Sequence, residues 1–335
     1  MKYKFLGKSG IRISELVMGA MTFGNECDKK TSFTLLDKFE SEGGNTIDTA
    51  NVYSNGNSES IVGEWLKSRD RDDFIIATKV RFPMGAQPNN AGISTKHIRS
   101  SLKKSLERLQ TDYIDLYQIH AWDMYTPLEE SLYTLSDLVD KGLVNYIGVS
   151  NFKGWQLQKA IDISEKYGFR KIISIQPQYN LLERGIEYEI KDVVEENGLG
   201  VISWSPLRGG WLTGKFKQNV KPIGTNTRVE RSSAIDPGEA WERYNNDRTW
   251  EIIKKEEDIA NRRGVTVSQV SINWVRSHKW ITAPIIGARN LEQLKDNLSS
   301  LNWELDNNEI EELNHVSMMK NFYPYDFIEW AVKRR

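Results

Sequence analysis

The sequence predicts a (β/α)8 barrel, the α/β fold in which eight parallel strands alternate with helices around a closed sheet. Two observations support this prediction: eight short apolar runs recur along the chain, and amphipathic helical runs lie between them. Most of the apolar runs do not alternate with polar residues, as expected of parallel strands covered on both faces. A doubly wound open sheet is the rival fold, but no GxGxxG motif follows any predicted strand.

The eight predicted strands are short runs rich in valine and isoleucine. They cover residues 15–20, 45–49, 74–80, 113–120, 145–150, 172–176, 200–205 and 281–287.

The helices between them are predicted from apolar residues at helical spacing. In one run these residues are Ile98, Leu102, Leu106 and Leu109, which form a single stripe along a helix. A second stripe, over 128–138, has a proline before it and a glycine after it, the residues that commonly flank the start and the end of a helix. Further helices are expected near 29–43, 57–69, 153–167, 187–197, 247–263 and 290–299.

Two segments are additional to the eight strand–helix units of a minimal barrel. Residues 2–16 read as a hairpin that precedes the first barrel strand, with Gly10 near its turn. The second segment runs from Pro206 to about Asn246, follows the seventh strand and contains scattered proline and glycine. A loop of this length is usually functional, and its position places it on the face where barrel active sites lie.

Composition narrows the class of protein. The 335 residues fit one barrel domain, 1–335, that includes a tail at 318–335. The 45 Lys and Arg nearly cancel the 46 Asp and Glu, so no nucleic-acid partner is expected. The single cysteine, Cys27, fits a reducing compartment, and no leader or membrane span is visible. We expect a soluble cytoplasmic protein without a membrane partner, either a monomer or a small homo-oligomer.

Polar side chains stand where the predicted strands end. Asp48, Lys79 and His120 end the second, third and fourth strands, and Tyr53 follows Asp48 by five residues. Each has a plain structural interpretation when taken alone, such as a turn cap, a surface lysine, a core histidine or a surface aromatic. Their joint position favours a functional site, because the carboxyl ends of barrel strands meet at one mouth.

The four side chains also make chemical sense together. A tyrosine loses its proton near pH ~10, and a nearby cation such as Lys79 favours the phenolate. Asp48 can hold Lys79 charged and oriented, while His120 can hydrogen-bond a substrate oxygen. This set suits proton donation to a carbonyl that is becoming an alkoxide. Neither a nucleophilic triad nor a metal site is predicted, because no Ser, Cys or His stands at the required spacing.

Several long motifs resemble the aldo-keto reductase family. The resemblance covers about residues 3 to 315 and implies the same (β/α)8 barrel. Its motifs are "GGNTIDTANVYSNGNSESIVG" (43–63), "RLQTDYIDLYQIH" (108–120), "GLVNYIGVSNF" (142–152), "QPQYNLLER" (176–184), "VISWSPLRGGWLTGKF" (201–216) and "PIIGARNLEQLKDNL" (284–298).

The resemblance implies an enzyme that reduces aldehydes or ketones to alcohols with a nicotinamide dinucleotide. Tyr53 would be the general acid, assisted by Lys79 with its partner Asp48, and His120 would orient the substrate carbonyl. The residues implied to bind the cofactor are Gly19, Thr22, Phe23, Asp48, Ser150, Asn151, Gln176, Trp204, Ser205, Leu207, Gly209, Leu212, Gly287, Arg289, Gln293 and Asn297.

Within that set the resemblance implies distinct roles. Ser150, Asn151 and Gln176 would bind the nicotinamide carboxamide, and Trp204, where Tyr or Phe is common, would stack on its ring. Residues 205–212 would follow the pyrophosphate, and residues 287–297 would hold the adenosine. Ala288 replaces a frequent serine, but the fork of Arg289 suits a 2′-phosphate, so NADPH is favoured over NADH.

The substrate is not specified beyond a small carbonyl compound, such as a small aldehyde, an aryl aldehyde or an open-chain sugar. The candidate substrate-binding residues are Phe23, Tyr53, Phe82, His120 and Trp122, with Met124 and the aromatic residues of 321–330 as further candidates. Those tail aromatics could equally pack on the barrel exterior. Arg184 or Arg208 could recruit an anionic substrate.

Two other functions remain open at this stage. One is a nicotinamide-binding regulatory subunit with slow turnover, since some similar barrels serve as channel partners. The other is a barrel that acts on sugar phosphates without a redox cofactor. The nicotinamide-site motifs disfavour the second of these.

Overall fold

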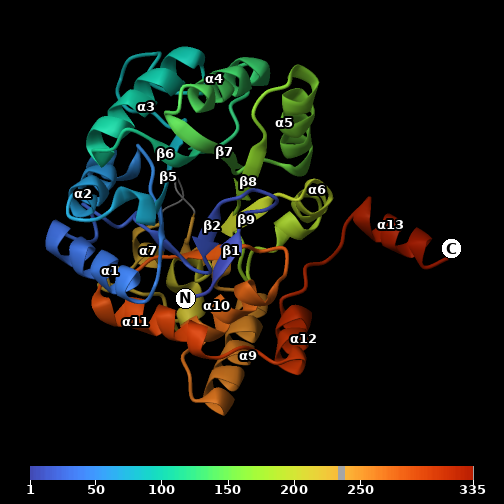
Figure 1. Ribbon diagram of the computed structural model, residues 1–335. Coiled ribbons are helices and arrows are strands. Elements are labelled where there is room, and N and C mark those ends of the chain that lie inside the picture. Colours follow the sequence, from blue (N-terminus) through green and yellow to red (C-terminus); the bar gives the residue numbers. More distant parts are fainter. Residues whose placement is uncertain (233–237, 335) are drawn as a thin grey trace.

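The computed structural model describes residues 1–232 and 238–334 of the chain. Within them, eight parallel strands close into a barrel in the order β10-β3-β4-β5-β6-β7-β8-β9, and helices surround it (Figure 1). The predicted (β/α)8 barrel is therefore confirmed. Consecutive strands are neighbours throughout, so the carboxyl ends of all eight strands open on the same face.

All eight predicted strands are present, with ends shifted by a few residues. β9 ends earlier than predicted because Ser205 adopts a left-handed backbone with φ 60°, which stops the extended chain. The strands are β3 (Val17–Gly19), β4 (Thr46–Asp48), β5 (Ile75–Val80), β6 (Ile114–Ile119), β7 (Val144–Ser150), β8 (Ile172–Gln176), β9 (Gly200–Ser203) and β10 (Ala283–Ile286).

The predicted helices are also present, and the structure adds several others. α10 was not predicted, although its apolar residues Val267, Val270 and Trp274 recur at helical spacing; in the structure its polar residues are buried as well. The helices are α1 (Lys29–Ser41), α2 (Asn57–Leu66), α3 (Thr95–Leu109), α4 (Leu128–Asp140), α5 (Gly154–Tyr167), α6 (Ile190–Asn197), α7 (Arg228–Arg231), α8 (Trp241–Tyr244), α9 (Asp247–Arg263), α10 (Val267–Ser277), α11 (Leu291–Ser299), α12 (Asn307–Val316) and α13 (Tyr325–Val332). Short 3₁₀ helices cover η1 (Tyr53–Gly56), η2 (Arg71–Asp73), η3 (Gly185–Glu187), η4 (Arg208–Thr213) and η5 (Ser300–Asn302).

The predicted hairpin consists of β1 (Tyr3–Phe5) and β2 (Arg12–Ser14), and Figure 1 shows it in front of the barrel. Gly10 lies in the turn between the two strands, as predicted, and the left-handed position of that turn is Gly7, with φ 59°. A Cβ at Gly7 would lie 2.5 Å from the backbone nitrogen of Gly200, the first residue of β9. The hairpin thus packs against the amino-terminal end of the barrel.

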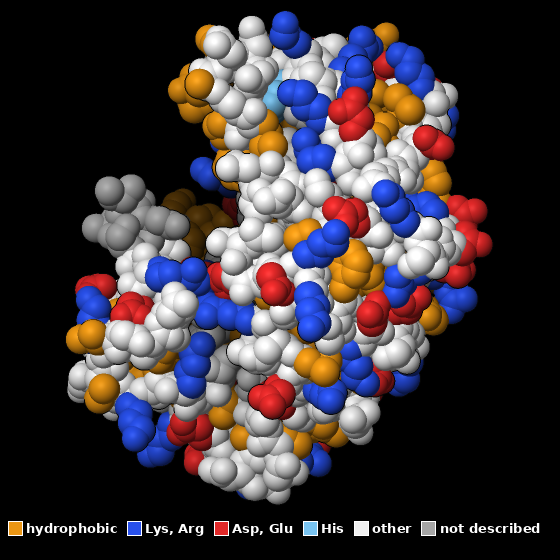
Figure 2. All heavy atoms as spheres, turned by 90° about the vertical axis from the view of Figure 1, so that its left-hand side faces the viewer, with side chains coloured by type: hydrophobic (Ala, Val, Ile, Leu, Met, Phe, Trp, Pro, Cys, Tyr) orange, Lys and Arg blue, Asp and Glu red, His pale blue; other side chains and the backbone are white. Residues whose placement is uncertain are grey.

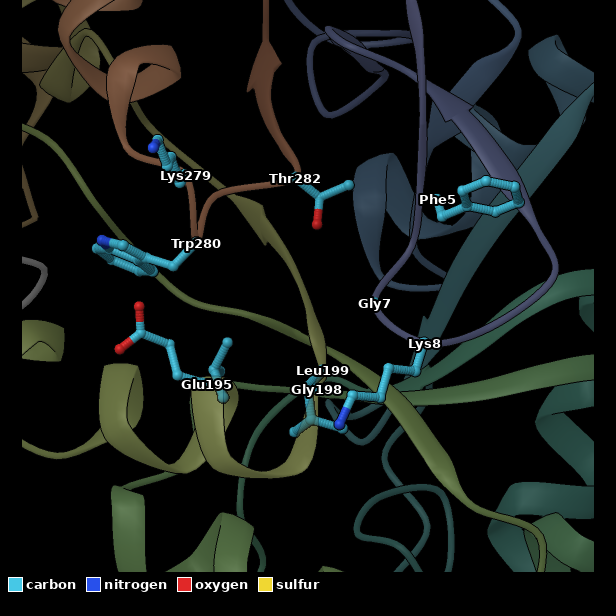
Figure 3. A pocket seen from close by; sticks show the side chains of 10 residues that line it. Phe5, Gly7, Lys8, Glu195, Gly198, Leu199, Lys279, Trp280 and Thr282 are labelled. Atoms are coloured by element: carbon cyan, nitrogen blue, oxygen red, sulfur yellow. The ribbon is translucent and has the colours of Figure 1, made fainter.

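A cavity of about 320 Å³ lies beside this hairpin, between its turn, the end of α6 and the segment before β10 (Figure 3). Its walls include Lys8, Glu195 and Trp280. Because these residues precede β9 and β10, the cavity is at the amino-terminal end of the strands. It is therefore separate from the face where the polar strand ends meet.

The long segment after β9 folds on itself. It contains η4, α7 and α8, and residues 233–237, including Pro237, lie outside the described residues. The rings of Trp211 and Trp241 stack with centroids 5.1 Å apart, and the Trp211 indole donates a hydrogen bond to the Glu239 carbonyl at 2.8 Å. These contacts give the segment an aromatic core of its own.

The tail ends in α13, which extends away from the barrel (Figure 1). The Tyr188 ring packs against two rings of the tail, with its centroid 5.1 Å from that of Phe322 and 4.7 Å from that of Tyr325. The Tyr325 hydroxyl donates a hydrogen bond to the Glu189 carboxylate at 2.8 Å. Of the two positions considered for the tail, these contacts favour the barrel exterior. No helix within 1–232 or 238–334 is long and apolar enough to cross a membrane.

A buried carboxyl group lies between α9 and α10. Glu256 is fully buried, one of its oxygens contacts the Ser271 hydroxyl, and the other has no hydrogen-bond partner among the described residues. The Ser271 hydroxyl also reaches the Leu212 carbonyl at 3.1 Å. Burial raises the pKa of Glu256 to about 8, although the hydrogen bond to Ser271 opposes the shift. The group is therefore protonated at neutral pH.

We predict that Glu256→Gln stabilises the protein at pH 7 and has little effect near pH 4. In the unfolded chain a Glu ionises near ~4.3, while the folded state keeps this proton to about pH 8, so stability falls as pH rises between the two values. The neutral amide removes that loss, which is on the order of 3 kcal/mol at pH 7. Urea unfolding at both pH values measures it, with exposed Glu251→Gln on the same helix as control. Equal effects at the two pH values would contradict the prediction.

Candidate active site

The structure brings the four predicted catalytic side chains together at the carboxyl ends of β4, β5 and β6. The Lys79 ammonium lies 2.5 Å from an Asp48 carboxylate oxygen and 3.4 Å from the Tyr53 hydroxyl. The rings of Tyr53 and His120 meet edge to face, with centroids 5.7 Å apart. Lys79 is fully buried, Asp48 and His120 are buried, and Tyr53 is half-buried.

Two further contacts fix the ion pair. Lys79 also donates to the Thr49 carbonyl at 2.8 Å, so its ammonium faces three oxygen atoms. The second Asp48 oxygen accepts from the amides of Gln176 at 2.7 Å and Gln118 at 3.4 Å. Sequence reasoning missed Gln118, although a glutamine inside an otherwise apolar barrel strand could have indicated it.

The pKa of each group follows from this environment. Burial alone would lower the pKa of Lys79, but Asp48 and Tyr53 raise it above its usual value, so the amine stays protonated. Burial lowers the pKa of His120 to about 2, with help from Lys79 and Arg81, so its imidazole is neutral.

Tyr53 departs from the expectation drawn from the sequence. Lys79 does favour the phenolate, as expected, but burial outweighs it and raises the pKa of Tyr53 above its usual value, with Asp48 adding to the rise. The net direction of the pKa shift is upward because burial is the largest cause, and the Asp48 carboxylate offsets part of the effect of the lysine charge. The resting Tyr53 side chain is therefore the protonated phenol.

A left-handed turn positions Tyr53. Ser54, Asn55 and Gly56 have φ of 50°, 53° and 94°, which turns the chain sharply between Tyr53 and α2. At Gly56 a Cβ would lie 2.7 Å from the Arg108 side chain, so glycine is needed there. Arg108 in turn pairs with the fully buried Glu59 at 2.7 Å. The turn is thus supported from α3.

Polar contacts link the ends of the next strands. The Ser150 hydroxyl donates to the Gln176 carbonyl at 2.7 Å, and the Asn151 amide donates to the His120 carbonyl at 2.9 Å. The Trp204 indole donates to the Asn151 side chain at 3.2 Å. These four residues, which the resemblance assigns to the nicotinamide, therefore lie close together and beside His120.

The segment assigned to the pyrophosphate begins in an unusual backbone. Ser205 and Gly209 both have φ near 60°, and Leu207 is half-buried. Leu212 is fully buried and presents no surface to a cofactor, which contradicts its predicted contact. Arg208 is buried and donates to the Tyr244 hydroxyl and, at 2.7 Å, to the Gly238 carbonyl.

Neither arginine considered for an anionic substrate is free to bind one. Besides the contacts of Arg208, Arg184 pairs with Glu187 at 2.8 Å and donates to the Asn314 carbonyl at 2.9 Å. The expectation that either arginine recruits an anionic substrate is wrong, because both guanidinium groups hold the fold together.

The residues assigned to the adenosine surround the end of β10. A Cβ added at Gly287 would meet nothing within 4 Å, so this backbone borders open space. The Asn297 amide donates to the Gly287 carbonyl at 3.2 Å, and Gln293 accepts from the Arg289 backbone at 2.9 Å. Thr22, after β3, donates to the Ala288 carbonyl at 3.2 Å.

Gly19 ends β3, and a Cβ there would lie 2.7 Å from the Ile285 side chain. Glycine at this position therefore permits the close approach of β3 and β10.

The candidate substrate walls divide into two groups. The Phe82 ring lies 4.8 Å from the His120 ring, and Trp122 packs on Phe152 at 5.2 Å, so both stand near the mouth. Phe23 is fully buried and presents no surface to a substrate or cofactor, which contradicts its predicted contacts. Met124 is 75% exposed. Figure 2 shows a deep notch in the surface with hydrophobic side chains inside it.

These residues fit a nicotinamide dinucleotide. Among the described residues, several buried polar atoms have no hydrogen-bond partner, including both ends of the Asn51 amide and His120 Nδ1. Open backbone at Gly287, a half-buried indole at Trp204 and the cation of Arg289 suit the ends of such a molecule. By contrast, no group of three His, Cys, Asp or Glu within the described ranges could hold a metal ion.

The fold and the site together define a class of protein: a parallel barrel with a lysine-supported phenol and a neutral imidazole at its mouth. The model of the "Aldo/keto reductase family" matches residues 15–317, and this chain belongs to that family. Family membership supports an oxidoreductase acting on carbonyl groups, with a small-molecule substrate.

The chain is similar to several curated proteins along nearly its whole length. It is 38% identical to "Uncharacterized oxidoreductase YrpG" of Bacillus subtilis, covering 94% of this chain and 96% of that protein. It is 33% identical to "Norsolorinic acid reductase B" of Dothistroma septosporum, over 98% of this chain and 84% of the relative. It is also 33% identical to "Probable voltage-gated potassium channel subunit beta" of Arabidopsis thaliana, over 90% of this chain and 91% of that protein.

We predict that Asp48→Asn destabilises the protein by about 3–5 kcal/mol, because it leaves the buried Lys79 ammonium without its counter-ion. The double variant Asp48→Asn, Lys79→Met should recover much of this loss, since no charge then remains to be compensated. Chemical unfolding of the wild type, both single variants and the double variant gives the coupling between the sites. Simple additivity of the two single effects would contradict the prediction.

Proposed function

We propose that this protein, as a single barrel domain with a C-terminal tail, reduces the carbonyl group of a small aldehyde or ketone with NADPH. Small aliphatic, aryl and sugar aldehydes are the candidate substrates. The observation that best supports the proposal is the position of Lys79, which is buried between the Asp48 carboxylate and the Tyr53 hydroxyl. A cation held there can stabilise a phenolate formed at Tyr53.

In this proposal Tyr53 supplies the proton. Its raised pKa keeps the phenol protonated at rest, which is the form that a general acid needs. As the substrate oxygen becomes an alkoxide, the O–H bond of Tyr53 breaks and the proton passes to that oxygen. The resulting phenolate lies 3.4 Å from the Lys79 ammonium, and the charge of Lys79 is maintained by Asp48.

His120 would orient the substrate. Its imidazole is neutral because its pKa lies near 2, so it carries one N–H and can donate one hydrogen bond to the carbonyl oxygen. Its ring contacts Tyr53 on one side and Phe82 on another, which limits its rotation. A neutral donor polarises the carbonyl without competing with Tyr53 for the role of acid.

A bound nicotinamide dinucleotide would supply the hydride. Trp204 would face its ring, and Ser150, Asn151 and Gln176 would lie at the carboxamide, although the Gln176 amide already donates to Asp48. Residues 205–209 would border the pyrophosphate, and Gly287, Arg289, Gln293 and Asn297 the adenosine. The guanidinium of Arg289 supports NADPH over NADH.

A nicotinamide-binding regulatory subunit with slow turnover is the second candidate. The observation that favours it is the 33% identity to a relative whose printed name is a potassium channel subunit beta. The two candidates predict different rates rather than different folds, so kinetics separate them.

We predict that Tyr53→Phe reduces the rate of carbonyl reduction by at least about 10²-fold, because the variant has no proton to donate. Nicotinamide binding should change little, since the hydroxyl is the only group lost. NADPH oxidation measures the first property, and quenching of tryptophan fluorescence measures the second. Phe82→Leu, at a ring that also contacts His120, is the matched control and should alter KM more than kcat. A Tyr53→Phe variant with normal turnover would exclude Tyr53 as the acid.

We also predict rapid, saturable NADPH oxidation with at least one member of a panel of aliphatic, aryl and sugar aldehydes, and slower oxidation of NADH. Arg289→Ala should reduce the preference for NADPH by on the order of tenfold, through loss of a charge-assisted contact to the 2′-phosphate. Slow turnover across the whole panel would favour the regulatory subunit. Equal efficiency with NADPH and NADH in the wild type would contradict the cofactor assignment.

A further inference from the structure

One carboxylate joins three separated parts of the chain beside the β10 end of the barrel mouth. Glu26 lies between β3 and α1, and one of its oxygens is 3.1 Å from Arg228 and 2.7 Å from Arg231, both in α7. Its other oxygen is 2.6 Å from Arg289, which follows β10. We call these four residues the Glu26 cluster.

The Glu26 cluster connects the long segment after β9 to the barrel body. α7 belongs to that segment, whereas Glu26 and Arg289 stand on loops that follow barrel strands. Arg289 also donates to the Asn226 carbonyl at 3.2 Å. Within the described residues, the ion pairs of Arg228 and Arg231 are both to Glu26, so removing its carboxylate leaves this edge of the segment with fewer attachments.

The cluster holds more positive charge than one carboxylate can neutralise. Three guanidinium groups face one carboxylate, and Lys215 lies near enough that Arg289 and Arg228 lower its pKa, after burial as the larger cause. Burial alone would raise the pKa of Glu26, but Arg228, Arg231 and Arg289 lower it, so the carboxylate is charged. Figure 2 shows Lys and Arg side chains gathered below the notch.

Because the ion pairs of Glu26 with its three arginines are partly exposed, another anion can take the place of the carboxylate. The side chains of Arg228, Arg231 and Arg289 are 26%, 42% and 32% exposed, and pairs of this kind contribute modestly to stability. A phosphate monoester carries nearly two charges and three acceptor oxygens, so it can displace a single carboxylate from such arginines.

We propose that Glu26 sets the specificity for the 2′-phosphate of the cofactor: it holds α7 beside the barrel through Arg228 and Arg231, pairs with Arg289, and yields these arginines to that phosphate. The proposal rests on the assignment of NADPH above and adds a competing residue to it. Glu26 thus keeps the arginines gathered when no phosphate is bound, and it lowers their net affinity for the phosphate that replaces it.

The test compares Glu26→Gln with Glu242→Gln. Glu242 lies in the same segment, pairs with Lys221 at 2.5 Å and has no contact with the cluster, so its variant loses the same charge elsewhere. Two readouts are used: amide hydrogen exchange of peptides covering 216–232 in nucleotide-free protein, and calorimetric affinity for adenosine 2′,5′-bisphosphate and for AMP. The two nucleotides differ only in the 2′-phosphate.

For Glu26→Gln we expect exchange in 216–232 to rise by about fivefold or more, because the segment is tethered less firmly. We expect about fivefold tighter binding of the bisphosphate and no comparable change for AMP, since only the 2′-phosphate competes with Glu26. Glu242→Gln should match the wild type in its affinity for both nucleotides, and in exchange outside the peptides that contain its partner Lys221.

Unchanged exchange in Glu26→Gln, or an equal change for both nucleotides, would overturn the proposal. So would failure of the wild type to bind the bisphosphate more tightly than AMP. None of these results depends on turnover, so they are distinct from failure of carbonyl reduction, which the aldehyde panel reports.

Discussion

The buried ammonium group of Lys79 is the constraint on which the barrel mouth depends. Moving an isolated charge from water into a protein interior costs several kcal/mol even after relaxation, so the surrounding chain must provide an opposite charge and hydrogen-bond partners. Here the acceptors come from β4, the residue after it and η1, and they converge on one nitrogen. The relative positions of β4 and β5 and the turn that carries Tyr53 are therefore fixed by the same atom that the proposed chemistry uses.

Compensation of that charge extends across the barrel. The Asp48 oxygen that does not face Lys79 accepts from Gln176 of β8, and Gln118 of β6 lies at 3.4 Å. This explains why amide side chains occupy the interior of strands that are otherwise apolar: a second donor lowers the cost of burying the carboxylate. Together with burial, it also explains why Tyr53 is a weaker acid at rest than an isolated lysine neighbour would make it. The neighbour of Tyr53 is the Lys79–Asp48 ion pair, whose net charge is close to zero.

Whether a feature of the structure can be predicted from the sequence depends on how far apart its interacting residues lie along the chain. Apolar runs and strand-end polar residues are local signals, and they located all eight strands and the four catalytic candidates. α10 also carries such a local signal, in the helical spacing of Val267, Val270 and Trp274, although it was not predicted. The burial of Phe23, the commitment of Arg184 and Arg208 to structural contacts, and the tether at Glu26 depend on partners far away in the chain. Glu26 and Arg231, for example, are separated by 205 positions. No local pattern encodes such a pairing.

Burial also distinguishes the two charge networks at the mouth. Lys79 and Asp48 are almost inaccessible, so exchanging either partner for water or a ligand would cost much of the pair's stabilisation. The arginines of the Glu26 cluster are partly exposed, and they outnumber the carboxylate, so in our proposal a dianion can replace the carboxylate there. A permanent pair suits the proton donor, which must keep one geometry through each turnover. An exchangeable cluster suits a site whose proposed ligand must enter and leave.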